Sequence, residues 1–157
     1  DFCLSRGLGD VYKRQAQYIA KKKAAAYEDY LKDDTLVITA DTVVILDNKI
    51  FGKPSDEACA KQMLRELSGR THQVVTGVCL STADKQHAFS VTSEVRFATL
   101  TESEIEYYVT RYKPLDKAGA YGIQEWIGFV GVEFISGSYY NVMGLPIQRL
   151  FRELKNF

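Results

Sequence analysis

Short apolar runs rich in β-branched residues constrain the fold of this chain more than any other feature of its sequence. Leu36-Val37-Ile38 and Val43-Val44-Ile45-Leu46 are two such runs, and they lie close together in the chain. Short continuous apolar runs of this kind are typical of buried β-strands. Asp47-Asn48, which follows the second run, is a turn signal before a further apolar pair, Ile50-Phe51. The sequence therefore predicts a sheet whose first strands are largely buried.

Amphipathic helices are predicted around these strands. Pro54-Ser55-Asp56 predicts a helix start with Ser55 or Asp56 as the N-cap, and residues 101–104 form a capping box. Residues 74–80 and 89–97 alternate as strands do, with a polar turn between them. The predicted inner faces of the helices are Ala60, Met63, Leu64 and Leu67; Ile105, Tyr108, Val109 and Tyr112; and Ile147, Leu150, Phe151 and Leu154. Residues 119–144 are expected to be strand and loop. This order predicts an α/β fold with a mixed sheet flanked by helices.

The composition is that of an ordinary globular protein with balanced charge. A chain of 157 residues fits one domain, and its 20 basic and 20 acidic side chains give no global field to attract nucleic acid or an anionic membrane. Three scattered cysteines, Cys3, Cys59 and Cys79, form neither a disulfide scaffold nor a zinc site. No apolar run approaches the ~20 residues of a membrane span. We therefore expect a cytoplasmic, single-domain protein with no nucleic-acid or membrane partner.

The first fifteen residues do not resemble the rest of the chain. They contain Ser5, Gly7 and Gly9, which favour turns, and they show no helical stripe. Their sequence resembles a translated adapter tail, although a genuine flexible terminus is the alternative. We therefore expect residues 1–15 to be a non-native or artefactual tail. The single domain would span residues 16–157 and begin with an Ala- and Lys-rich helix over residues 16–31.

Asp41 stands between the two apolar runs. A carboxylate in this place is not needed for folding, and it costs free energy if it is buried without a partner. At the end of a strand it would project into a cleft, where it could bind a divalent cation or accept a proton from water. A plain turn aspartate between two strands explains the residue equally well at this level.

Two further segments carry polar groups in constrained backbone. Gly52 and Pro54 flank Lys53, and a lysine presented from a fixed turn suits a phosphate group, although a solvated loop lysine is the alternative. Residues 116–124 combine a carboxylate and an ammonium with small residues, and they end in Gln124, whose amide offers both a donor and an acceptor to a base edge. By itself this second segment would be a tight turn into a strand. His72 and His87 lack partners at metal-ligand spacing, which favours a structural or surface role for each over a catalytic one.

Together and in this order, these segments resemble the Maf family of nucleoside-triphosphate pyrophosphatases. The resemblance extends from Tyr18 to Phe157. It rests on the segments Ile19-Ala20-Lys21-Lys22-Lys23-Ala24, Ala40-Asp41-Thr42-Val43-Val44, Gly52-Lys53-Pro54-Ser55-Asp56, Leu67-Ser68-Gly69-Arg70-Thr71-His72, Val75-Thr76-Gly77-Val78, Asp116 to Gln124, and Tyr140-Asn141-Val142-Met143-Gly144-Leu145-Pro146. It implies hydrolysis of a nucleoside triphosphate to the monophosphate and pyrophosphate. It also implies a fold like that of inosine-triphosphate pyrophosphatases, with a long sheet and a cleft between two lobes.

The resemblance also implies roles for individual residues. Asp41 matches the family's proton acceptor and is a candidate ligand for a divalent cation, magnesium or manganese. Lys23 and Lys53 match lysines at the phosphate end of the cleft. Thr42 and Gln124 match positions that help to choose the base, and this pair resembles the branch acting on dTTP and UTP rather than on 7-methyl-GTP.

The pair Asp116 and Lys117 is expected to support the site. Family members begin with a strand and a Ser-Pro-Arg-Arg turn, where this sequence has residues 1–15 instead. The missing arginines would grip the triphosphate, and a missing acidic residue would help to bind metal. We therefore expect this polypeptide, as an N-terminally truncated member, to be impaired or inactive.

Two other functions stay open at this level. One is the same chemistry on a modified or different base. The other is a non-catalytic regulator of cell division, since the family has been linked to septum arrest. Its binding surface would be an exposed apolar patch around Trp126, Ile127 and Phe129, for which core packing is the alternative. Related proteins are often dimers, so a homodimer is expected.

Overall fold

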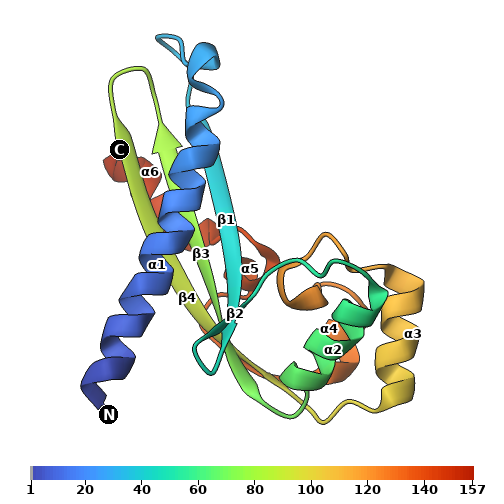
Figure 1. The fold of residues 1–157 in the computed structure, drawn as a ribbon. Helices are drawn as coiled ribbons and strands as arrows, with labels where there is room; N and C mark the ends of the chain where they lie inside the picture. Colours follow the sequence, from blue (N-terminus) through green and yellow to red (C-terminus); the bar gives the residue numbers. More distant parts are fainter. Residues whose placement is uncertain (1) are drawn as a thin grey trace. The chain divides into compact units, whose positions relative to one another are not determined.

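The computed structural model describes residues 2–157, and the side chains of residues 9–157 (Figure 1). The helices are α1 Phe2–Ala25, α2 Glu57–Leu67, α3 Glu102–Tyr112, α4 Trp126–Gly131, α5 Tyr139–Met143 and α6 Ile147–Asn156, with short 3-10 helices η1 Glu28–Tyr30 and η2 Ala118–Ala120. The strands are β1 Val37–Leu46, β2 Lys49–Phe51, β3 Thr71–Ser81, β4 Gln86–Phe97 and β5 Val132–Ser136. No helix of the described residues is long and apolar enough to cross a membrane.

The strands form one five-stranded sheet in the order β2-β1-β3-β4-β5. β1 and β2 pair antiparallel with Val44 opposite Phe51, and β4 and β5 pair antiparallel with Val95 opposite Ile135. Asp47 and Asn48 take positive φ angles of 50° and 63°, the conformation that a two-residue hairpin loop between β1 and β2 requires. The predicted α/β fold with a sheet flanked by helices is therefore confirmed.

The chain divides into two compact units. Unit 1 contains the described residues up to Thr42 together with Val75–Thr92 and Tyr140–Phe157, and unit 2 contains Val43–Val74 and Ser93–Tyr139.

In unit 1, helices α1 and α6 pack on opposite faces of strand β3. Val78 and Leu80 contact Leu150 of α6, whereas Cys79, which points the other way, packs with Ala20 of α1. A Cβ atom at Gly77 would overlap the backbone of α1, so the glycine allows helix and strand to come into direct contact.

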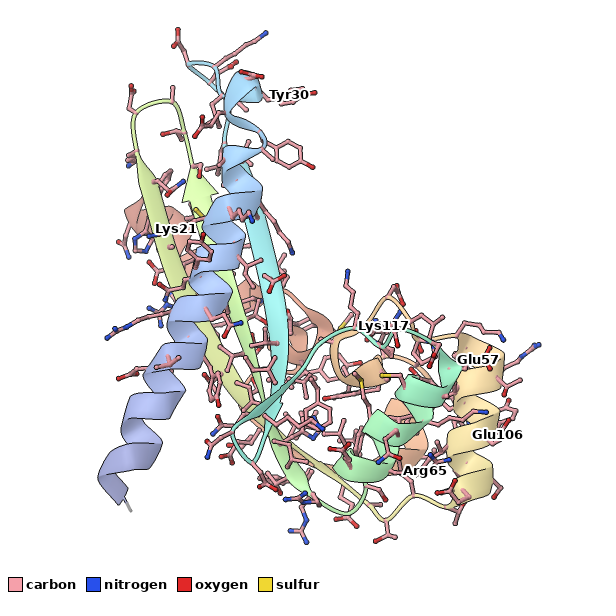
Figure 2. All side chains as sticks on the ribbon, viewed as in Figure 1. Lys21, Tyr30, Glu57, Arg65, Glu106 and Lys117 are labelled. Atoms are coloured by element: carbon pink, nitrogen blue, oxygen red, sulfur yellow. The ribbon has the colours of Figure 1, made fainter. Side chains whose placement is uncertain are left out.

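In unit 2, helices α2 and α3 lie against each other and are joined by ion pairs. Arg65 bonds to Glu102 at 2.9 Å, and Lys61 contacts Glu106 at 2.6 Å (Figure 2). Both helices begin as predicted. The Asp56 side chain accepts a hydrogen bond from the Cys59 N–H, and Thr101 and Glu104 form a capping box.

The first helix and the first strand both differ from the prediction. Helix α1 runs from Phe2 to Ala25 rather than over residues 16–31, so it includes the glycines expected to break it. The stripe Tyr12, Ala16, Ala20 and Ala24 is buried at four-residue spacing, and this packing outweighs the ~1 kcal/mol that a helical glycine costs. The two apolar runs expected to be separate strands form one unbroken strand, β1.

Some residues predicted to face the core do not. In the last helix only Leu150 is buried, whereas Ile147 and Phe151 are 47% and 54% exposed and Leu154 is also exposed. Tyr112 of α3 is exposed too. Residues 119–144 contain helices α4 and α5 as well as the expected strand. Helical spacing alone therefore identified amphipathic faces without showing what covers them.

Candidate functional site

Asp41 lies in the middle of strand β1, with 20% of its side chain exposed. Its carboxylate oxygen Oδ1 accepts a hydrogen bond from the Lys23 ammonium of α1 at 2.7 Å, and Lys23 also donates to the Ala40 carbonyl at 2.9 Å. Because β1 is continuous through this position, Asp41 is not the turn residue that was the alternative. A half-buried carboxylate needs such a partner, and Lys23 provides it.

Thr42 follows on the same strand and begins a chain of polar contacts. Its hydroxyl lies 2.9 Å from the Thr76 hydroxyl, which donates to the Asn141 carbonyl at 3.2 Å. Each hydroxyl has a single hydrogen, so Thr42 must donate to Thr76. The Asn141 amide nitrogen donates in turn to the Val91 carbonyl at 3.2 Å. Thr76 and Asn141 are fully buried. Neither was among the predicted site residues, although both lie in segments that resemble the family.

Unit 2 brings two of the sequence segments together. The Gly119 N–H donates to the Gly52 carbonyl at 3.1 Å, so the loop that carries Lys53 is bonded to the segment that follows Asp116. The Lys117 hydrogen bond lowers the pKa of the Asp116 carboxyl below its usual value, and the charge of Lys53 adds to this effect. Lys53 and Asp116 therefore act on each other electrostatically within unit 2.

Lys117, labelled in Figure 2, forms ion pairs with two carboxylates. Its ammonium contacts Asp116 Oδ1 at 3.0 Å and Glu125 Oε1 at 3.3 Å. Partial burial lowers the pKa of Lys117, but the hydrogen bonds to the two carboxylates outweigh it and raise the pKa overall. Lys117 therefore stays charged at neutral pH. Glu125 directly follows Gln124 but was not among the predicted site residues.

Gln124 is exposed in a turn that leads into helix α4, not into a strand as expected. The turn is closed by a hydrogen bond from the Glu125 N–H to the Gly122 carbonyl at 3.0 Å. The amide group is thus displayed at the surface of unit 2, where it can donate and accept hydrogen bonds.

His72 is a buried structural histidine, as predicted. Its Nε2 atom and the Tyr121 hydroxyl are 2.6 Å apart, and both rings pack against Phe97. Burial lowers the pKa of His72 to about 4, so the ring is neutral at physiological pH. This pair anchors the backbone just before Gly122.

The residues suggested as a partner-binding surface differ in how far they are buried. Ile127 is fully buried, and the Trp126 ring packs edge-on against Tyr107 at 4.8 Å. Phe129 is 76% exposed, and with Phe134 it lines a groove along α4 and β5. Only part of the proposed patch is therefore at the surface.

Candidate metal ligands are sparse in the part of the chain that the structure describes. No three His, Cys, Asp or Glu side chains gather there. Asp41 provides one carboxylate, and magnesium typically uses one or two carboxylates and takes its other ligands from phosphates and water. The residues present therefore fit an ion of that kind and not a cage made only of protein ligands.

Sequence comparisons agree with the resemblance of this sequence to a known family. The family model described as Maf-like protein matches residues 8–157. The dTTP/UTP pyrophosphatase of Phocaeicola vulgatus is 62% identical over 138 residues, which cover 88% of this chain and 72% of the relative. The proteins of the same name from Bacteroides fragilis and Porphyromonas gingivalis are 60% and 58% identical, over 88% and 89% of this chain and 72% and 71% of the relatives.

Proposed function

Since this chain belongs to the Maf-like protein family, we propose that it hydrolyses dTTP and UTP to the nucleoside monophosphate and pyrophosphate. The similar proteins named above carry dTTP/UTP pyrophosphatase as their name. The observation that carries the proposal is the Asp41–Lys23 pair, in which a half-buried carboxylate is held at 2.7 Å by an ammonium group. A strand and a helix fix both groups, as general base catalysis requires.

Asp41 acts as the catalytic base in this proposal. It accepts a proton from a water molecule, whose oxygen forms a bond to the α-phosphorus. The bond from that phosphorus to the oxygen bridging the α- and β-phosphates breaks, and its electron pair leaves with pyrophosphate. Removal of the proton makes the water a stronger nucleophile at neutral pH.

Lys23 and Lys53 are assigned to the phosphates. Each supplies a compact positive charge, which neutralises the oxygens of the triphosphate and of the leaving pyrophosphate. Asp116 and Lys117 are assigned to the support of Lys53. Lys117 bonds to Asp116, and the charge of Lys53 acts on the same carboxylate, so the three side chains form one cluster of mixed charge within unit 2.

Thr42 and Gln124 are assigned to selection of the base. The Thr42 hydroxyl donates its hydrogen to Thr76, so the Thr42 oxygen can only accept a hydrogen bond from a ligand. The Gln124 amide can donate to one atom of a pyrimidine edge and accept from another. These properties suit thymine and uracil, which carry a donor next to an acceptor.

A magnesium or manganese ion is part of the proposal, with Asp41 as its candidate ligand among the described residues. Such an ion would supply positive charge against the phosphate oxygens.

The cytoplasm is the proposed setting, and the free thiols of Cys59 and Cys79 suit its reducing conditions.

The test compares Asp41→Asn with a matched control, Asp84→Asn, whose carboxylate is exposed in the β3–β4 turn. Pyrophosphate release is measured with dTTP, UTP and a panel of canonical and methylated triphosphates in magnesium or manganese. We expect the Asp41 substitution to lower the rate by at least about a hundredfold and the control to leave it unchanged. Unchanged release in Asp41→Asn would refute the assignment, and a preference for another base would replace the substrate.

Protein binding is a second candidate function, favoured by the exposure of Phe129 beside the groove on α4 and β5. An exposed apolar patch can serve as an interaction site for a cell-division partner. Phe129→Ser should then abolish binding to that partner while nucleotide hydrolysis continues. Loss of both together would show that the substitution acts on the fold instead.

A further inference from the structure

The turn that carries Gln124 is held on both sides by one side chain. The hydroxyl of Tyr108 accepts a hydrogen bond from the Gly122 N–H at 3.0 Å and donates to Glu125 Oε2 at 2.6 Å. Gly122 and Glu125 are also bonded to each other through the backbone at 3.0 Å. A single hydroxyl thus links the residues that flank Ile123 and Gln124.

Tyr108 is itself rigidly placed. It belongs to α3, its side chain has no exposed surface, and its ring stacks on Tyr112 with 5.2 Å between centroids. The hydroxyl has one hydrogen to give and lone pairs to receive, and both contacts use it in that way. Burial, and then the hydrogen bond to Glu125, raise the pKa of Tyr108, so the hydroxyl keeps its hydrogen at physiological pH.

A second residue, Lys117, contacts the same turn. Glu125 receives the Lys117 ammonium at 3.3 Å, and the aliphatic part of Lys117 lies directly over Gly122. A Cβ atom at Gly122 would be 2.9 Å from Lys117 Cε and 3.2 Å from Glu125 Cδ, so both side chains lie close to this glycine. Hydrogen bonds and close packing therefore leave the turn little freedom.

We propose that Tyr108 is a positioning residue for base selection, because its hydroxyl fixes the turn from which Gln124 reads the base. This inference rests on the proposed function and deepens it. Tyr108 is buried and does not touch the nucleotide; it acts through Gly122 and Glu125.

Base chemistry explains why a fixed turn matters. Thymine and uracil present an oxygen acceptor where cytosine presents an amino donor. A glutamine amide has both a donor and an acceptor end, so a freely moving amide can satisfy either kind of base. Only an amide held in one place and orientation distinguishes them. Loosening the turn should therefore reduce discrimination more than it reduces catalysis.

The experiment uses Tyr108→Phe, which keeps the ring and deletes the hydroxyl. Binding of the α,β-imido analogues of dTTP and dCTP is measured by calorimetry, together with kcat and KM for dTTP and dCTP. We expect the preference for the thymine nucleotide to fall about tenfold through binding and KM, with kcat for dTTP changing little. Tyr112→Phe removes a hydroxyl from the same helix and should leave the preference unchanged.

A merely structural role would give a different result. It would lower thermal stability and weaken the binding of both analogues equally. An unchanged preference for the thymine analogue over the cytosine analogue would overturn the inference. If Tyr108→Phe does not fold, Glu125→Met removes the acceptor at the other end of the same hydrogen bond, and it should reduce the preference in the same direction. Wild-type protein that binds neither analogue would overturn the proposed function and this inference with it, whereas normal wild-type binding with an unchanged preference in the variants would overturn this inference alone.

Discussion

The two compact units hold their candidate site residues in different ways. In unit 1, Lys23 lies on helix α1, and Asp41 and Thr42 lie on strand β1. Their contacts are direct: one ion pair at 2.7 Å and one hydroxyl pair at 2.9 Å. The backbone of a regular element places these groups, and one or two hydrogen bonds orient each of them.

In unit 2, Lys53, Asp116, Lys117 and Gln124 lie on loops and turns. These segments are fixed by residues far away in the sequence. Tyr108 is 14 positions from Gly122, and His72 is 49 positions from Tyr121. Loops lack the internal hydrogen bonds of helices and strands, so a buried polar network takes their place.

This difference has a consequence for mutation. A site group on a regular element should be sensitive to replacement of the group itself and of its one partner. A site group on a loop should also be sensitive to replacement of buried residues that touch no substrate. Unit 2 should therefore show more indirect effects than unit 1.

The largest expected effect comes from a direct replacement in unit 2. Lys53→Met removes the charge assigned to the phosphates and keeps a side chain of similar length. We expect kcat/KM for dTTP to fall by about a hundredfold to a thousandfold, as when one charge-stabilising group is removed from other active sites. Steady-state pyrophosphate release measures it, and Lys49→Met, on neighbouring strand β2, is the control. An effect equal to the control would show that the loop contributes shape and not charge.

The next effect tests the buried support of unit 2. Burial lowers the pKa of His72 from 6.5 to about 4, so between these values the unfolded chain binds more protons than the native one. The free energy of unfolding therefore falls as the pH drops from 6.5 to about 4, by about 3 kcal/mol over the whole interval. His72→Gln should remove that part of the pH dependence in urea unfolding at pH 7 and 4.5. His87→Gln, at an exposed site, should keep it. If the free energy of unfolding changed equally between pH 7 and 4.5 in wild type and in His72→Gln, the assignment of this pH dependence to His72 would be wrong.

The sequence predicted those parts of the fold that depend on local chemistry. The Asp56 cap, the Thr101 capping box and the turn at Asp47 and Asn48 all follow from side chains that bond to nearby backbone or tolerate positive φ angles. The start of α1 was not predicted, because burial of Tyr12 and the alanines that follow it is a tertiary effect. The exposed face of α6 was missed for the same reason.

The candidate site shows the same division. Asp41 was singled out because a carboxylate amid apolar runs is unusual in a sequence, but its place within a strand needed the structure. Tyr108 had been assigned to the core by its helical spacing, and it is indeed buried. That spacing carries no information about its hydroxyl, whose partners Gly122 and Glu125 are brought to it only by folding.

A smaller effect is expected from the single partner in unit 1. Lys23→Met leaves Asp41 without its ammonium group and removes one of the charges assigned to the phosphates, so it should lower kcat/KM for dTTP by at least about tenfold, the scale of one charge-assisted hydrogen bond. Thermal stability should change little, because Lys23 is half exposed. Lys21→Met removes a neighbouring exposed lysine of α1 (Figure 2) and should preserve activity. A large loss of stability in Lys23→Met would mean that this pair supports the fold as unit 2's network does.

The smallest effect concerns the threonine pair of unit 1. Thr42→Val keeps the shape of the side chain but removes the hydrogen that Thr76 accepts, whereas Thr42→Ser keeps that hydrogen. Because Thr76 is buried and its oxygen would lose its donor, we expect Thr42→Val to lower the free energy of unfolding by about 1 kcal/mol. Thr42→Ser should lower it by less. Urea unfolding of the two variants separates lost packing from the lost bond. If valine cost nothing and serine cost about 1 kcal/mol, the methyl group of Thr42 and not its hydroxyl would be what unit 1 requires, and the direct polar contacts that distinguish unit 1 from unit 2 would be reduced to the Asp41–Lys23 pair.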